Sequence, residues 1–237
     1  MTKAAKTMSA LVSGVVGGVL SVAAMTGSAA EDGRPDISSG WEFRVLLNGR
    51  DVGRHRFMVE RQGDRETVTI DADFDVKLLG ISVYEYKHRN VEVWSQDCLD
   101  AMKTTTDDGG DSYSVYAVRV QAGLRVIANG RENLLPGCVM SFAYWNPDFL
   151  SQARLLNAQT GEYVRVSSRP VGEESIELPN GRTVKANRYR VSVEGTGDID
   201  LWYQDNRRWV RLKSLVKGAD LIYELLDTFA SEFTPKR

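Results

Sequence analysis

The sequence predicts a mainly all-β protein: an antiparallel meander that curls into a barrel or half-barrel, with one short amphipathic helix packed against it. Three observations lead to this prediction. Short segments with alternating apolar and polar residues follow one another along the chain. Turn residues separate them, including Asn-Gly-Arg tripeptides at 48–50, 129–131 and 180–182. The segments are also too many for one flat open sheet, so we expect the sheet to curl.

Residues 1–30 have the layout of a secretory signal peptide. Lys3 and Lys6 precede sixteen uncharged residues, 9–24, and small residues end the segment at Ala29 and Ala30. We expect cleavage there, which leaves residues 31–237 as a single β-barrel-like domain in the periplasm. No later segment is apolar enough over its length to cross a bilayer, so we expect no transmembrane span after cleavage.

The predicted strands begin with a tight hairpin. Segments 41–47 and 52–60 flank Asn48-Gly49, two residues that tolerate the positive φ of a two-residue turn. The further predicted strands are 65–75, 81–94, 99–105, 112–120, 124–128, 163–168, 175–178, 183–194, 199–203, 209–215 and 221–226.

One helix is predicted after residue 145. Asn146 suits an N-cap, Pro147 the first helical position, and Asp148 the positive end of the helix. Helical spacing places four apolar residues on one face: Phe149, Leu150, Ala153 and Leu156. This face must be buried, and we expect it to pack on the barrel mouth or on the inner surface of the sheet.

The two cysteines, Cys98 and Cys138, predict one disulfide in an oxidising compartment. Closing a loop of about forty residues stabilises the fold by roughly 3–4 kcal/mol on the chain-entropy model. Two cysteines without a neighbouring histidine do not make a zinc site, and their spacing is too wide for a redox motif.

Composition argues against several classes of partner and of chemistry. The formal net charge of −2 gives no electrostatic reason to expect nucleic acid or an anionic membrane as a partner. The two histidines, His55 and His88, lie in mid-strand among polar neighbours, and we interpret both as surface residues. No Gly-x-Ser-x-Gly elbow is present. We therefore predict a protein that is not an enzyme and has no cofactor.

Three aspartates, Asp71, Asp73 and Asp75, share one face of a strand by their period of two. Such a row of carboxylates requires cationic neighbours, solvent or a hard cation such as calcium. We favour cross-strand pairing with basic residues of the neighbouring strands, namely Arg54, Arg56 or Lys87, and predict no metal site.

Aromatic residues provide the remaining functional signal. Tyrosine and tryptophan side chains line the ligand cavities of barrels because they combine an apolar body with a polar atom. The candidate ligand-binding residues are Tyr84, Tyr86, Trp94, Phe142, Tyr144, Trp145, Phe149, Leu150, Trp202 and Tyr203. The alternative is that these large side chains simply fill the core.

Four segments, 142–147, 155–162, 201–203 and 209–212, together resemble an exported bacterial family of domains of unknown function. The run Leu-Asn-Ala-Gln-Thr-Gly-Glu at 156–162 is the most specific of the shared motifs, and Leu-Trp-Tyr at 201–203 is another. One feature departs from the family pattern, since Gln204 stands where an acidic residue is usual. The resemblance implies no known activity, substrate or catalytic residue. More loosely, the architecture is similar to periplasmic half-barrels that carry lipid or lipoprotein.

Two functions of different classes follow from these observations. The first is an exported periplasmic binding or accessory protein that holds an apolar ligand, a lipid or acyl chain, in the curled sheet. The alternative is an envelope structural or protein-interaction module with a filled barrel and no small ligand, which would use a sheet edge for contact. A hydrolase with scattered carboxylates ranks last. The expected partner is thus a hydrophobic small molecule or an envelope protein, and the sequence leaves the oligomeric state open.

Overall fold

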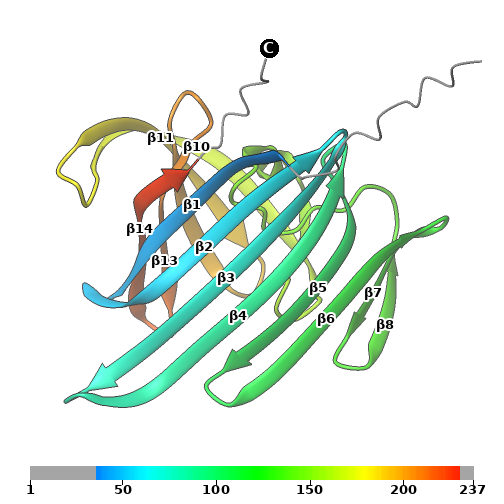
Figure 1. Cartoon of the computed structure of the whole chain (residues 1–237), viewed down its shortest axis with the longest axis horizontal. Coiled ribbons are helices and arrows are strands. Elements are labelled where there is room, and N and C mark those ends of the chain that lie inside the picture. Colours follow the sequence, from blue (N-terminus) through cyan, green and yellow to red (C-terminus); the bar gives the residue numbers. More distant parts are fainter. Residues whose placement is uncertain (1–35, 230–237) are drawn as a thin grey trace, which may run out of the picture. The chain divides into compact units, whose positions relative to one another are not determined.

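The computed structural model describes residues 36–229 of the chain. The predicted signal peptide, residues 1–30, lies outside the described residues. The described part forms one curled sheet of fourteen antiparallel strands (Figure 1), which confirms the predicted all-β meander. Between residues 36 and 229, no helix is both long and apolar enough to cross a membrane.

The elements follow one another closely along the chain. They are β1 (Asp36–Leu47), β2 (Arg50–Gln62), β3 (Arg65–Leu78), β4 (Ile81–Ser95), β5 (Cys98–Asp108), β6 (Asp111–Val120), β7 (Gly123–Ala128), β8 (Arg131–Leu135), the 3-10 turn η1 (Pro147–Ser151), β9 (Arg154–Leu156), β10 (Tyr163–Glu177), β11 (Thr183–Val193), β12 (Gly197–Tyr203), β13 (Trp209–Val216) and β14 (Ala219–Phe229).

The first strand of the sheet pairs with the last. The strand order is β8-β7-β6-β5-β4-β3-β2-β1-β14-β13-β12-β11-β10-β9. Strands β1–β8 therefore form one meander of sequence neighbours and β9–β14 a second. The two meanders meet at the antiparallel β1–β14 pair, which runs from Gly40 opposite Phe229 to Leu47 opposite Leu221.

A short segment, residues 139–141, lies between β5 and β9 and helps to close the curl. The backbone N–H of Leu99 donates to the carbonyl of Val139 at 2.9 Å, and the N–H of Leu156 donates to that of Met140 at 2.9 Å. Next to this segment Cys98 and Cys138 form the predicted disulfide, with their Cα atoms 5.1 Å apart. The disulfide therefore ties the closing segment to the start of β5.

Side chains alternate between a buried inner face and a charged outer face, as period two requires. On the outer face the aspartates of β3 meet cations: Asp71 lies opposite Arg56, and Asp73 lies between Arg54 and Lys87. The register places both aspartates beside basic residues, and the ion pair of Asp71 is with Arg89 on β4 at 3.4 Å.

The predicted amphipathic helix is wrong in its type and length. Asn146 caps η1 as expected, accepting from the N–H of Asp148 at 3.1 Å. Helical bonding then stops, because Gln152 is extended (φ −82°, ψ 144°). Leu155 and Leu156 belong to β9 and pair with β10. Pairing in the sheet ladder thus overrides the apolar spacing that suggested a longer helix.

Three further details of the strands differ from the predictions. The predicted strands 163–168 and 175–178 are one strand, β10, whose register shifts between Pro170 and Gly172. A bulge accommodates a proline and a glycine that looked like a strand break. Strands β8 and β9 were not predicted, because β8 is polar and almost fully exposed and β9 has only three residues.

Candidate functional site

The inner face of the curled sheet holds a pocket of about 240 Å³. Its wall combines aromatic, aliphatic and polar side chains from β2–β4, β11, β12, β14 and the two loops around η1. The lining residues are His55, Phe57, Ile70, Tyr86, His88, Asn90, Glu92, Ser141, Phe142, Tyr144, Asn157, Ala158, Gln159, Val193, Thr196, Ile199 and Tyr223. A larger hollow, of about 960 Å³, lies over the charged outer face of β2–β6, where Arg89 pairs with Asp71 at 3.4 Å.

His55 is the most unusual polar group of the interior pocket. Its Nδ1 lies 3.3 Å from the hydroxyl of Tyr223, while its buried Nε2 has no hydrogen-bond partner among the described residues. Burial, with a smaller contribution from His88, lowers the pKa of His55 to about 3. The imidazole is therefore neutral near pH 7 and offers one unused hydrogen-bonding atom inside an aromatic wall.

Glu92 is a second polar residue of the lining and is held by side chains of its own strand. Its carboxyl oxygens accept from Asn90 Nδ2 and from Trp94 Nε1, each at 2.9 Å. Thr104 in turn donates to Asn90 Oδ1 at 2.8 Å. Burial raises the pKa of Glu92 above its ordinary value, against the effect of these hydrogen bonds. The network fixes the carboxyl group rather than leaving it free to react.

The Leu-Asn-Ala-Gln-Thr-Gly-Glu motif forms a tight loop that presents side chains to the pocket. The side-chain oxygen of Asn157 accepts from the backbone N–H of Gln159 at 2.8 Å and of Thr160 at 3.2 Å. Gly161 has a φ of +74°, and a Cβ at this position would collide with the side chain of Ala128 on β7. The glycine therefore permits both the turn and its close packing against the sheet.

The same loop connects to tyrosines at one end of the pocket. Tyr86 donates to Gln159 Oε1 at 3.1 Å, and Gln159 Nε2 donates to Asp108 at 3.0 Å. Tyr84 donates to the other carboxylate oxygen of Asp108. Burial raises the pKa values of both tyrosines well above their ordinary value. Their hydroxyl groups therefore remain protonated and join β4 to the motif loop.

The structure brings three of the sequence-predicted ligand residues, Tyr86, Phe142 and Tyr144, together in the pocket wall. Trp94 lies behind the wall, where it anchors Glu92. Tyr84 is connected to the pocket only through Asp108 and Gln159.

The other five candidates do not line the pocket. Trp145 packs edge-on against Trp94 with ring centroids 5.6 Å apart, and Phe149 is fully buried against Tyr144. Leu150 is partly buried at the periphery of the core. The hydroxyl of Tyr203 donates to the carbonyl of Tyr144 at 2.8 Å. Trp202 lies in the outer charge network described below.

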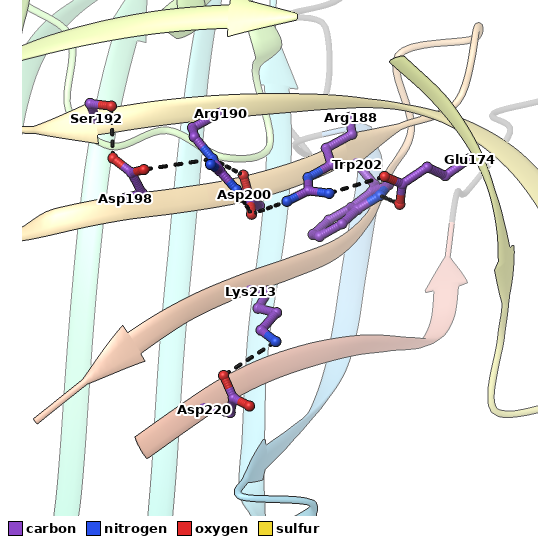
Figure 2. Close-up of polar contacts among 9 residues, drawn as sticks. All are labelled: Glu174, Arg188, Arg190, Ser192, Asp198, Asp200, Trp202, Lys213 and Asp220. Atoms are coloured by element: carbon purple, nitrogen blue, oxygen red, sulfur yellow. Dashed lines mark hydrogen bonds and ion pairs between the residues drawn. The ribbon is translucent and has the colours of Figure 1, made fainter. Parts of the chain in front are cut away.

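Figure 2 shows this outer network, which spans β10–β12. Asp200 accepts from Arg188 at 2.5 Å and from Arg190 at 2.8 Å. Glu174 accepts from Arg188 at 3.1 Å and from the indole N–H of Trp202 at 2.8 Å. Although burial opposes ionisation of Asp200, the two arginines hold its pKa below the usual value. Both carboxylates are thus ionised and paired, so the network joins strands and leaves no free acid or base.

The interpretation of the two histidines as surface residues is wrong. His55 and His88 face the inside of the sheet and are not surface residues. His88 lies 2.8 Å from the hydroxyl of Thr106, and burial lowers its pKa to about 4. The sequence already indicated an interior position, because residues two apart on a strand share a face. His55 shares a face with Phe57 and Val59, and His88 shares one with Tyr86. Asn90 and Glu92 could have been assigned to the interior in the same way.

The lining can form hydrogen bonds, and its histidine and tyrosine side chains are uncharged near neutral pH. The imidazoles are neutral, and burial raises the pKa values of Tyr144 and Tyr223 as well as that of Glu92. Among residues 36–229, no group of three or more histidine, cysteine, aspartate or glutamate side chains could hold a metal ion. The geometry thus suits an uncharged molecule that is mainly apolar.

Comparison with known proteins identifies the family and the fold. A family model described as a domain of unknown function, DUF6134, matches residues 43–226. No curated protein matches the sequence. Among solved structures, the fold is similar to a β-barrel-like protein of the domain of unknown function DUF1849 from Brucella abortus. The TM-score is 0.59 at 9% identity, over 84% of this chain and 99% of that chain. At this identity the similarity concerns the fold alone.

Proposed function

The chain belongs to the DUF6134 family of domains of unknown function, and from that premise we propose that it is an exported periplasmic binding protein. Its ligand is an apolar molecule that inserts one end into the interior pocket. The observation that carries the proposal is the buried, unpartnered Nε2 of His55 inside an aromatic and aliphatic wall. A buried polar atom without a partner is costly, and a ligand atom would satisfy it.

The size of the pocket limits the part of the ligand that enters. A volume of about 240 Å³ corresponds to roughly eight water molecules at about 30 Å³ each. A methylene group occupies a similar volume, so the pocket accepts an apolar group of about eight carbon atoms. The aliphatic and aromatic wall, including Phe57, Ile70 and Phe142, suits such a group, and His55 suits one hydrogen-bonding atom on it.

Export is supported by the sequence of residues 1–30 and by the disulfide. Disulfides persist in oxidising compartments such as the bacterial periplasm, and Cys98 and Cys138 are bonded. The mass of the protein recovered from a periplasmic fraction tests this part of the proposal. We expect a chain that lacks residues 1–29 or 1–30, whereas a full-length chain in the cytoplasm would contradict export.

Native mass spectrometry of the purified protein, followed by organic extraction, tests ligand binding. We expect an added mass that extracts as an apolar compound. Ala158→Leu fills part of the pocket from the motif loop, and we expect this variant to lose the added mass. Thr183→Leu adds the same kind of side chain at the exposed start of β11, and this variant should retain the added mass.

Circular dichroism of both variants checks that they are folded. Wild-type protein without any added mass, or an added mass that Ala158→Leu retains, would contradict binding in this pocket.

A further inference from the structure

The turn between β3 and β4 exposes an unusual number of apolar side chains. Leu79 is 95% exposed, and Leu78, Ile81 and Val83 are each more than half exposed. We call residues 78–83 the β3–β4 tip. Figure 1 shows this hairpin reaching beyond the neighbouring β1–β2 hairpin at the lower left. Scattered exposed apolar residues are normal, but a contiguous group at a projecting end indicates a contact surface.

The conformation of Leu79 shows that hairpin formation does not require leucine at this position. Leu79 has a φ of +52°, and Gly80 follows it with a φ of +82°. Asn48 and Asn129 occupy the corresponding position before glycine in the turns of two other hairpins. Asparagine tolerates this conformation, whereas it is strained for a residue such as leucine. Leucine is thus unfavourable at this position for two reasons: it strains the turn, and it exposes an apolar side chain to water.

A second apolar group lies at the same end of the sheet. Leu215 and Val216 are exposed at the end of β13, next to the turn between β13 and β14. Lys217, the next residue, places its ammonium group 5.7 Å from the centre of the Tyr84 ring on β4. This contact brings the two turns together, so their apolar side chains belong to one end of the molecule.

The charges around this end are of both signs and do not dominate. Arg50 and Lys77 border a common hollow with Asp51 and Asp75 beside the β3–β4 tip, and Lys217 belongs to the β13–β14 turn. Lys77 also pairs with Asp75 at 3.1 Å, and the β5–β6 turn nearby is acidic. Apolar contact must therefore provide most of the binding, with the long basic side chains reaching polar headgroups.

The dimensions favour a lipid surface over a protein partner. A standard protein interface uses about 20–30 residues on each side, far more than two hairpin turns present. An interfacial anchor needs to enter a bilayer by only about 5–10 Å. At roughly 3.3 Å per strand residue, the segment from Gly80 to Val83 spans about that depth.

We propose that the β3–β4 tip, with the β13–β14 turn beside it, attaches the protein to a phospholipid bilayer by inserting Leu79 and its apolar neighbours below the headgroups. The inference rests on the exposed residues alone and does not depend on a ligand in the interior pocket.

Flotation with vesicles of phosphatidylethanolamine and phosphatidylglycerol tests the proposal, using residues 31–237. We expect the wild-type protein to float with the vesicles, also at high salt. Leu79→Asn removes the most exposed leucine but suits the positive φ, so the variant should fold at least as well. Burying one leucine corresponds to a roughly ten- to hundredfold change in partition, and we expect Leu79→Asn to bind more weakly by that factor.

Leu134→Asn is the matched control, because Leu134 is an exposed leucine on β8, outside both turns. It should float like the wild type. Absence of wild-type flotation, or equal binding of the two variants, would overturn the proposal. A change of oligomeric state in Leu79→Asn without vesicle binding of the wild type would also overturn it, since the tip would then be a protein contact.

Discussion

Replacement of His55 by phenylalanine should remove a specific part of the acid sensitivity of the fold. The imidazole pKa is about 3 in the folded protein against an ordinary value of 6.5. Below pH 6.5 the unfolded chain therefore takes up a proton that the folded chain does not accept until about pH 3. The stabilisation is complete above pH 6.5 and is lost progressively as the pH falls toward 3.

The size of the effect between pH 7 and pH 5 hardly depends on the folded pKa, because pH 5 lies well above it. About 1.36 kcal/mol per pH unit, over the 1.5 units between 6.5 and 5, gives about 2 kcal/mol. Urea unfolding at the two pH values, with the disulfide intact, measures this difference. His55→Phe should lose about 2 kcal/mol less than wild type on acidification.

Met58→Leu, on the outer face of the same strand, should behave like the wild type. The buried Glu92, whose raised pKa acts in the opposite direction, and His88 are present in all three proteins and cancel in the comparison. An equal acid loss in His55→Phe and wild type would show that His55 is protonated normally in the folded state and is accessible to water.

Three further substitutions test structural roles with the same urea assay at pH 7. Replacing Cys98 and Cys138 together by serine should lower the free energy of unfolding by roughly 3–4 kcal/mol, since the unfolded chain loses a loop constraint; an unchanged value would contradict that constraint. Asp200→Asn should lower the free energy of unfolding by about 2–4 kcal/mol because two arginines lose a buried anion. Asp198 is more exposed, so Asp198→Asn should lower it by less than about 1 kcal/mol. Similar losses in the two variants would refute the central role of Asp200. Gly161→Ala should cost more than about 2 kcal/mol through its positive φ and its collision with the sheet, and tolerance would show that the motif loop can move.

Local turn chemistry made most of the fold predictable. Asn48-Gly49 and Asn129-Gly130 adopt the positive φ values that their hairpins require. The alternation of apolar residues located most of the strands to within a few residues. Prediction failed where distant pairing decides the structure: Leu155 and Leu156 read as a helix face but form β9 against β10.

The candidate site was predictable only in part, for a related reason. The aromatic residues Tyr86, Phe142 and Tyr144 were expected to meet and do so. His55 and Glu92 were missed because their polar neighbours suggested a solvated strand, although their parity places them inside. Sequence alone also gives no signal that the Asn157–Gly161 loop packs on β7, since that contact depends on how the sheet curls.

The pairing of β1 with β14 means that the two ends of the described chain complete the middle of the sheet, while the middle of the chain supplies its edges. Each meander can assemble from neighbouring hairpins as the chain is synthesised. The two cannot join until the last strand has been made, so the protein reaches its final form only after synthesis of β14 is complete. Loss of β14 would therefore separate two otherwise continuous halves instead of trimming an edge, and the free border of β1 would become available to strands of other chains.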